Sequence, residues 1–299
     1  MDRILVPLDF SESSVDALRF ALPFARETGA RLDLLHVLDP VPAAYGPPGE
    51  AVYVPPTPDQ QQQRAAAARL KKLAAAEVRR PVHANSMVKE GAPARLINET
   101  AAELRSNLLI LSTHGHTGLK RFFLGSTAEK VVRRAPCPVL TVRRRVLART
   151  GTPQSPPSER INRILVPVDF SAPSREMLKF AVAFATQFRA SLVLLHVVNR
   201  INVPSRVVYY ATRMQMTVLH EGMTKLAEWA RRLVPADIQA EQIVRAGEPY
   251  DVIRAVARRE RADLIIVATR GHGPVKRFFI GSTAGRVVRH APCPVLVVR

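Results

Sequence analysis

The sequence predicts two copies of a doubly wound α/β domain, each with a Rossmann-like, five-stranded parallel sheet in the strand order 3-2-1-4-5. Three observations lead to this prediction. The segment ILVPLDFS at Ile4–Ser11 recurs as ILVPVDFS at Ile164–Ser171, 160 residues later, which indicates a duplicated unit. Within each copy, short apolar runs alternate with segments of helical periodicity. Runs as uniformly apolar as Leu108–Leu111 indicate strands buried on both faces, as in a parallel sheet covered by helices.

The elements of the first copy alternate between strand and helix. After the first strand, the apolar residues from Val15 to Ala25 recur at helical spacing. The proline-rich residues 39–58 are interpreted as a loop, and the alanine-rich segment after them as a helix. Pro93 suits the first turn of a further helix, and the last helix begins at Ser126. The expected strands are residues 4–8, 32–38, 82–88, 108–112 and 138–143, and the expected alanine-rich helix is residues 59–78.

The repeat also predicts the domain boundaries. KRFFLGSTA at Lys120 recurs as KRFFIGSTA at Lys276, an offset of 156 residues, so the first copy holds four extra residues upstream of this motif. The segment GTPQSPPSE lies between the copies and is typical of a flexible linker. We therefore expect a first domain at residues 1–145, a linker at 146–160 and a second domain at 161–299.

Composition excludes several classes of protein. The chain has 299 residues, 47% of them hydrophobic, and only two cysteines, so a disulfide scaffold is excluded. No apolar run approaches the roughly 20 residues that span a bilayer, and we expect a cytoplasmic protein without a membrane partner. The net charge of +19 attracts phosphates of every kind. The basic clusters are not interleaved with aromatic residues, however, which argues against a nucleic-acid partner.

The order 3-2-1-4-5 predicts where a ligand binds, because the crevice of such sheets lies beyond the carboxyl ends of strands 1 and 4. Asp9 ends strand 1, and Ser112 to Gly115 end strand 4. A Gly-Ser-Thr turn then opens a helix at Gly125, where unpaired N–H groups and the helix dipole favour a polyphosphate. The two loops are therefore expected to face each other across a nucleotide site.

Each residue of this crevice has an expected role. Asp9 accepts hydrogen bonds from ribose hydroxyls, and Val37 and Leu111 contact the adenine. Gly115 and Gly125 allow the backbone to approach phosphate oxygens, and hydroxyls and basic groups add donors. The other first-copy residues of the expected site are Ser112, His114, Ser126 and Thr127. The second-copy residues are Asp169, Val197, Val267, Ala268, Arg270, Gly271, Gly281, Ser282 and Thr283.

The motifs PxDFS, HG-x9-GST and APCPVL together resemble the universal stress protein family over nearly the whole chain. Nucleotide-binding members of that family carry G-x2-G-x9-G-[ST] after strand 4. Gly115, Gly125 and Ser126 match this pattern, as do Gly271, Gly281 and Ser282, but Ser112 and Ala268 replace its first glycine. The resemblance implies a regulatory adenine nucleotide (ATP, ADP or AMP) in stress response. It also implies pairing through the last strands, either as an intramolecular pseudo-dimer or as a homodimer.

Catalysis is not expected. The sequence has no Walker A, HExxH or GxSxG motif, so we interpret the chain as a binding protein, with slow incidental hydrolysis and a phosphate-bridged Mg²⁺ left open. The alternative function is a nucleotide-independent interaction scaffold with degenerate sites.

Several candidate residues also have a purely structural interpretation. Ser126 and Glu129 match a capping box, and Asp9 suits an Asx turn. The remaining candidates are His36 and His196, expected to be core or edge histidines, and Cys137 and Cys293, expected to be packed thiols.

Overall fold

A computed structural model describes residues 1–39, 43–45, 52–54, 60–79, 81–113, 125–143, 161–200, 208–269 and 281–299. Its contacts define two compact units, with a boundary between Cys137 and Pro138. Both units are α/β with parallel strands, which confirms the predicted fold class. The predicted linker at 146–160 lies outside the described residues.

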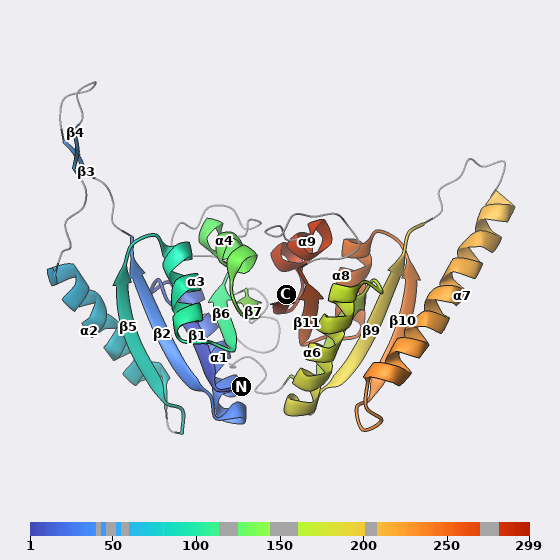
Figure 1. Ribbon diagram of the computed structural model, residues 1–299, viewed down its shortest axis with the longest axis horizontal. Coiled ribbons are helices and arrows are strands. Elements are labelled where there is room, and N and C mark those ends of the chain that lie inside the picture. The colour runs from blue at the N-terminus through green and yellow to red at the C-terminus, as the bar shows by residue number, and fades with distance from the viewer. Residues whose placement is uncertain are drawn as a thin grey trace. The chain divides into compact units, whose positions relative to one another are not determined.

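The first unit contains a parallel sheet in the order β5-β2-β1-β6, which is 3-2-1-4 in terms of the repeat (Figure 1). A small antiparallel pair, β3 with β4, lies within residues 39–58, so the interpretation of that whole segment as a loop was wrong. The run Val-Tyr-Val in β4 has the β-branched and aromatic composition that favours a strand. The elements are β1 (Arg3–Pro7), α1 (Glu12–Thr28), β2 (Arg31–Leu38), β3 (Ala43–Tyr45), β4 (Val52–Val54), α2 (Gln60–Glu77), β5 (Ala84–Glu90), α3 (Pro93–Glu103), β6 (Leu108–Ser112) and α4 (Ser126–Arg134).

The second unit contains the complete parallel order 3-2-1-4-5, as β10-β9-β8-β11-β12. It also includes β7 (Val139–Val142), which pairs antiparallel with β12. The other elements are β8 (Arg163–Val168), α6 (Ala172–Phe188), β9 (Ser191–Val198), α7 (Val208–Leu233), β10 (Ala240–Ala246), α8 (Pro249–Arg259), β11 (Leu264–Ala268), α9 (Ser282–His290) and β12 (Val295–Val298).

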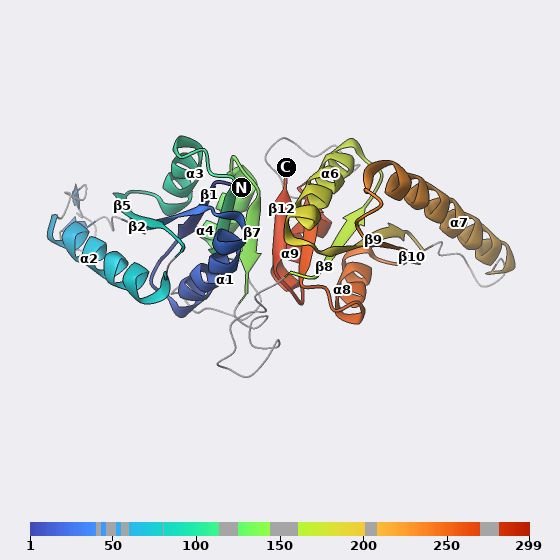
Figure 2. The same ribbon diagram turned by 90° about the horizontal axis from the view of Figure 1, so that it is seen from below.

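Helices cover both faces of the sheet in each unit (Figure 2). In the first unit α3 packs beside α4, while α1 contacts β1 and β6; in the second unit α8 packs beside α9. The central strands are buried as their sequence predicts: Leu108, Leu109 and Ile110 are fully inaccessible to solvent. This layering leaves the carboxyl ends of the strands as the edge where loops and helix N-termini meet.

The arginine that begins the first strand has different acidic partners in the two repeats. Arg3 Nε donates to Asp33 Oδ2 at 2.9 Å, and Asp33 lies in β2 with no exposed surface. Its other oxygen, Oδ1, has no hydrogen bond within the described part of the chain. In the second repeat Val193 occupies the place of Asp33, and Arg163 instead pairs with Glu241 and with Glu260, the latter at 2.6 Å. A buried carboxylate is therefore a feature of the first repeat.

Both cysteines are buried, as predicted. Burial raises the pKa of the Cys137 thiol to about 11; burial and then the Asp263 carboxylate raise the pKa of Cys293. Because the thiolate is the reactive form, we expect both thiols to react with Ellman's reagent at pH 8 at least 100-fold more slowly than free cysteine, on the order of their reduced thiolate fraction. Rapid labelling of the folded protein would contradict this expectation, and labelling in denaturant provides the control.

Candidate functional site

A pocket of about 380 Å³ lies at the carboxyl ends of β1, β2 and β6, beside the first turns of α3 and α4. Its lining includes every described residue of the expected first-copy site. These residues are Asp9, Val37, Leu111, Ser112, Gly125, Ser126 and Thr127. The topology therefore brings together residues that the sequence separates by more than one hundred positions. Of the expected site, His114, Gly115, Arg270 and Gly271 lie outside the described residues.

Asp9 has two roles in the geometry of this pocket. Its Oδ1 accepts from the Ser11 N–H at 3.0 Å and from Ser11 Oγ at 2.6 Å, while Ser11 Oγ accepts from the Ser14 N–H as the N-cap of α1. The Asx-turn interpretation is therefore confirmed, although Asp9 also lines the pocket. Asp169 in the second repeat accepts from the Ser171 N–H at 3.0 Å in the same way. The turn holds each carboxylate at the end of its strand.

Left-handed backbone follows each of these aspartates. Phe10 has a φ of 63° and Phe170 a φ of 62°, a conformation that is unfavourable for an aromatic residue. Each ring lies 4.3 Å from a histidine ring, His36 for Phe10 and His196 for Phe170. Packing of the two rings therefore supports the sharp bend after Asp9 and Asp169.

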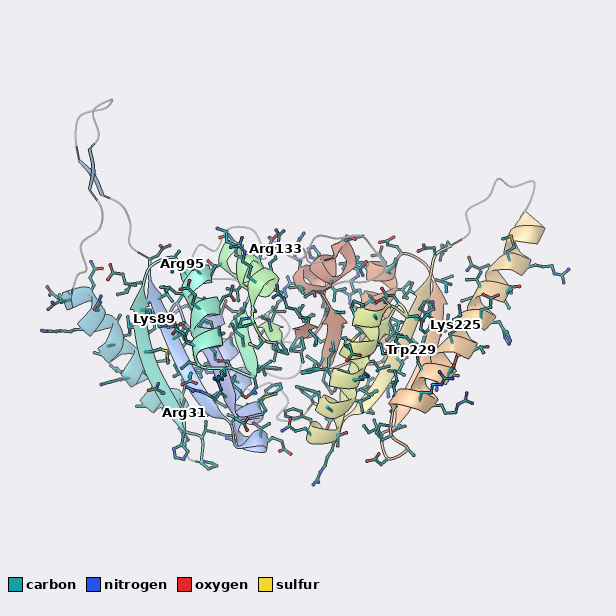
Figure 3. All side chains as sticks on the ribbon, viewed as in Figure 1. Arg31, Lys89, Arg95, Arg133, Lys225 and Trp229 are labelled. Atoms are coloured by element: carbon teal, nitrogen blue, oxygen red, sulfur yellow. The ribbon has the colours of Figure 1, made fainter. Side chains whose placement is uncertain are left out.

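The two histidines are structural, as predicted. His36 Nδ1 lies 2.7 Å from the Leu8 carbonyl oxygen, and His196 Nδ1 lies 2.9 Å from that of Val168. Each Nδ1–H group thus donates a hydrogen bond to the backbone carbonyl at the end of the first strand of its repeat. The repeats differ in what packs against the phenylalanine. In the first repeat the guanidinium group of Arg69 lies over the ring of Phe10. In the second repeat Trp229, on the side of α7 that faces α6, contacts Phe170 edge-on (Figure 3).

The Gly-Ser-Thr turn opens α4 as expected. The N–H group of its first residue, Gly125, however, is hydrogen-bonded within the protein. The Gly125 N–H donates to the Thr113 carbonyl oxygen at 2.8 Å, so it is bound to the end of β6 and is not the donor we expected for a phosphate. Glu129 N–H makes the first helical bond, to Gly125 O at 2.9 Å. The amides between them belong to the first turn, where a helix has no internal acceptors. Ser126 and Thr127 thus supply the N–H groups at the pocket.

The capping-box interpretation of Ser126 was wrong. Gly125 is the N-cap of α4, so Ser126 is the first helical residue, and Glu129 pairs with Arg133 at 2.6 Å instead of reaching back. An added Cβ at Gly125 would lie 3.3 Å from the Thr113 oxygen, which explains a glycine where the backbone entering α4 closely approaches the end of β6. The Ser126 hydroxyl stays exposed at the pocket, where a ligand can bind it.

The walls of the pocket divide by chemistry. Leu35, Ile97, Leu111 and Val131 supply apolar lining, and Asp9 and Asp39, which follow β1 and β2, supply acidic lining. A flat apolar base suits the apolar lining, and the hydroxyls of a sugar suit the acidic lining. The N–H groups of the first turn of α4 suit anionic oxygens. The residues present therefore fit an adenine nucleotide. Within the described ranges, no three His, Cys, Asp or Glu side chains come together as a metal site.

Sequence reasoning missed part of this lining. Asp39, Pro93 and Ile97 line the pocket but were not among the expected site residues. Pro93 was recognised as a helix start, and a helix that follows β5 must begin at the same sheet edge, so the signal was present. In the second repeat the counterparts hold equivalent positions. Asp169 follows β8, Val197 lies in β9, Val267 and Ala268 end β11, Gly281 is the N-cap of α9, and Ser282 and Thr283 begin that helix.

A sequence model of the universal stress protein family matches residues 1–143 and 160–299. The chain belongs to the universal stress protein family. Two curated relatives each match about half of this chain and most of their own length. Universal stress protein MJ0531 of Methanocaldococcus jannaschii is 33% identical over 142 residues, covering 48% of this chain and 82% of the relative. Universal stress protein YxiE of Bacillus subtilis is 32% identical over 146 residues, covering 46% of this chain and 99% of the relative.

Solved structures of the same fold extend over both repeats of this tandem universal stress protein. A universal stress protein from Archaeoglobus fulgidus matches with a TM-score of 0.64 and 20% identity, covering 100% of this chain and 96% of the other. A functionally unknown protein from Pseudomonas aeruginosa matches with a TM-score of 0.65 and 18% identity, covering 100% and 92%. Among the described helices, none combines the length and apolar character needed to cross a bilayer.

Proposed function

We propose that this tandem universal stress protein binds an adenine nucleotide, ATP, ADP or AMP, as a regulatory ligand. The observation that supports the proposal is the pocket in the first unit, which gathers all seven described residues of the expected first-copy site. Occupancy would stabilise the loops at the sheet edge, and a protein partner that recognises those loops would in turn change nucleotide affinity. The proposal needs a compartment that supplies adenine nucleotide, in keeping with the cytoplasmic location that the sequence predicts.

In this proposal the ligand is held rather than consumed. Asp9 binds the ribose hydroxyls, Val37 and Leu111 contact the adenine, and the first turn of α4 binds the phosphates. Asp9 already accepts two hydrogen bonds from Ser11, which suits a fixed acceptor. Magnesium, if the phosphates bring it, would enter with the nucleotide.

Two measurements on the full chain test nucleotide binding. We expect acid extraction of freshly purified protein to release adenine nucleotide, and calorimetry to show binding of ATP, ADP or AMP but not of a pyrimidine nucleotide of equal charge. The pyrimidine control separates recognition of the base from attraction by the net charge of +19. Absence of both extracted nucleotide and binding heat at millimolar ligand would refute the proposal.

A second candidate function is a nucleotide-independent interaction scaffold. Ser112 and Ala268 favour it, because both place a Cβ where the nucleotide-binding motif has its first glycine, and Ser112 lines the pocket. If the side chain blocks the ligand, Ser112→Gly will create binding that the natural chain lacks. If nucleotide binds already, the same change will alter affinity only a few-fold, as expected for loss of one small side chain.

We further propose that the repeats form an intramolecular pseudo-dimer through their last strands. Support comes from the second unit, which includes β7 in antiparallel pairing with β12, with Thr141 Oγ1 donating to Val295 O at 3.1 Å. Light scattering at several concentrations is expected to give the mass of one 33.0 kDa chain. A constant mass of two chains would favour the homodimer instead.

A further inference from the structure

Two arginines from different helices lie against one aromatic ring in the second repeat. Arg286 of α9 has its guanidinium carbon 4.3 Å from the centre of the Tyr250 ring, and Arg254 of α8 lies 5.6 Å from the same point. The two guanidinium groups are therefore no more than about 10 Å apart, and both are in cation–π range. Tyr250 is only 7% exposed, whereas the arginine side chains keep 46% and 41% of their surface in water. The ring thus orients two cations that stay accessible.

A histidine and two further arginines are associated with this pair. The ring of His290, the last residue of α9, lies 6.0 Å from that of Tyr250. Burial lowers the pKa of His290, and the charges of Arg143, Arg289, Arg286 and Arg254 lower it further. All four arginines and the histidine belong to the second unit. We call these five residues with Tyr250 the α8–α9 cluster.

The acids near the α8–α9 cluster do not neutralise it. Glu248 Oε1 lies 3.2 Å from Arg286, and Asp251 Oδ1 lies 3.7 Å from Arg254. Both carboxylates are more than half exposed, where an ion pair is weak and screened by salt. Because these two pairs are exposed and weak, a competing anion can displace them at Arg286 and Arg254.

The first repeat lacks this arrangement, which makes it a natural control. Ala94, Asn98 and Lys130 occupy the positions of Tyr250, Arg254 and Arg286. Arg95 of α3 pairs with Glu99 at 3.0 Å, and Arg133 of α4 pairs with Glu129 at 2.6 Å, each within its own helix (Figure 3). In α8 and α9 those two acids are replaced by Ala255 and Gly285. In the second repeat Arg254 still has an acid in its own helix, Asp251 at 3.7 Å, but Arg254 and Arg286 also have the aromatic support of Tyr250.

We propose that the α8–α9 cluster is an anion site that binds a phosphoryl group. Guanidinium forks match phosphoryl oxygens in geometry and charge, and two forks held by one ring lose little freedom on binding. A phosphoryl group would also offset the like charges around His290, so the imidazolium form would be favoured while the anion is bound. None of the cluster residues is among the residues expected in the nucleotide crevice of the second repeat. The ligand we propose is a free phosphate or pyrophosphate, and the test separates it from a nucleotide bound in the crevice.

The probe is inorganic pyrophosphate added to the full chain, with His290 followed by NMR and assigned by comparison with His290→Gln. We expect pyrophosphate to raise the pKa of His290 by about one unit relative to sodium chloride of equal ionic strength, because bound negative charge favours the imidazolium. Arg254→Gln with Arg286→Gln should abolish that rise. Lys130→Gln, the matched first-repeat change, should leave it intact. Circular dichroism checks that each variant is folded.

Three outcomes would overturn the α8–α9 site. The first is an equal effect of pyrophosphate and chloride, which would indicate screening alone. The second is a rise that persists in the double arginine variant. The third is a response to ATP without one to pyrophosphate, which would assign the ligand to the nucleotide crevice. Asp169→Asn should leave the pyrophosphate response unchanged, so failure of nucleotide binding and failure of this anion site are distinguishable.

Discussion

Replacing Arg3 by methionine is expected to lower the free energy of unfolding of the first repeat by about 3 kcal/mol, the cost of leaving a buried carboxylate without its partner. Asp33 has no exposed surface and is bound by Arg3 at 2.9 Å, while Arg31 Nε lies 4.0 Å from its second oxygen. Methionine keeps the stem of the arginine but removes the charge and the donor. Hydrogen exchange of β1 and β2 amides measures the effect, because it reports on this repeat separately.

The second repeat provides the rescue for this variant. Val193 stands where the first repeat has Asp33, so Asp33→Val restores a side chain that the same fold accepts. We expect Arg3→Met with Asp33→Val to recover most of the lost stability, because replacing both members of a buried ion pair is often neutral. Arg163→Met, whose acidic partners are partly exposed, should cost less than Arg3→Met. Equal losses in the single and double variants would contradict the assignment of the cost to Asp33.

Replacing Asp9 by asparagine is expected to weaken binding of adenine nucleotide to the first repeat by about 10- to 100-fold, the range for loss of hydrogen bonds to a charged acceptor. Asparagine keeps an Oδ1 that can accept from Ser11, so the turn before α1 should survive. The change therefore separates the ligand role of Asp9 from its structural role. Calorimetric titration with ATP measures it.

Two comparisons control the Asp9 experiment. Asp9→Ala removes the turn as well, and we expect it to add a stability loss of about 1 kcal/mol that Asp9→Asn does not show. Asp169→Asn should affect only the nucleotide site of the second repeat. Wild-type affinity and stoichiometry in the Asp9→Asn chain would show that the carboxylate serves the turn alone, and would favour the scaffold function.

Much of the fold followed from patterns that depend on local physics. The apolar runs at Leu108–Leu111 and the repeated ILVP segments predicted buried parallel strands because such strands admit few polar residues. The strand order then placed Asp9 beside the Gly-Ser-Thr turn, which the pocket confirms as neighbours. The role of these residues in binding nucleotide stays a prediction.

What the sequence did not predict depends on tertiary contacts. Gly125 was expected to let the backbone approach phosphate oxygens, but its own N–H group donates to Thr113 O, a contact that the local sequence does not indicate. The left-handed backbone conformation of Phe10 could not be predicted from its residue type, because it depends on packing of the ring against His36. The β3–β4 pair lies in a proline-rich stretch where prolines mask short strand-forming runs.

Trp229 is the only tryptophan of the chain, and its ring contacts Phe170 at 5.2 Å, one residue beyond Asp169. The tryptophan emission of this protein, excited selectively at wavelengths that tyrosine does not absorb, therefore originates in the second repeat. A ligand titration followed by tryptophan emission would report binding to the second repeat, whereas a calorimetric titration would report binding to both repeats. The difference between the two curves would give the occupancy of each half without mutating either.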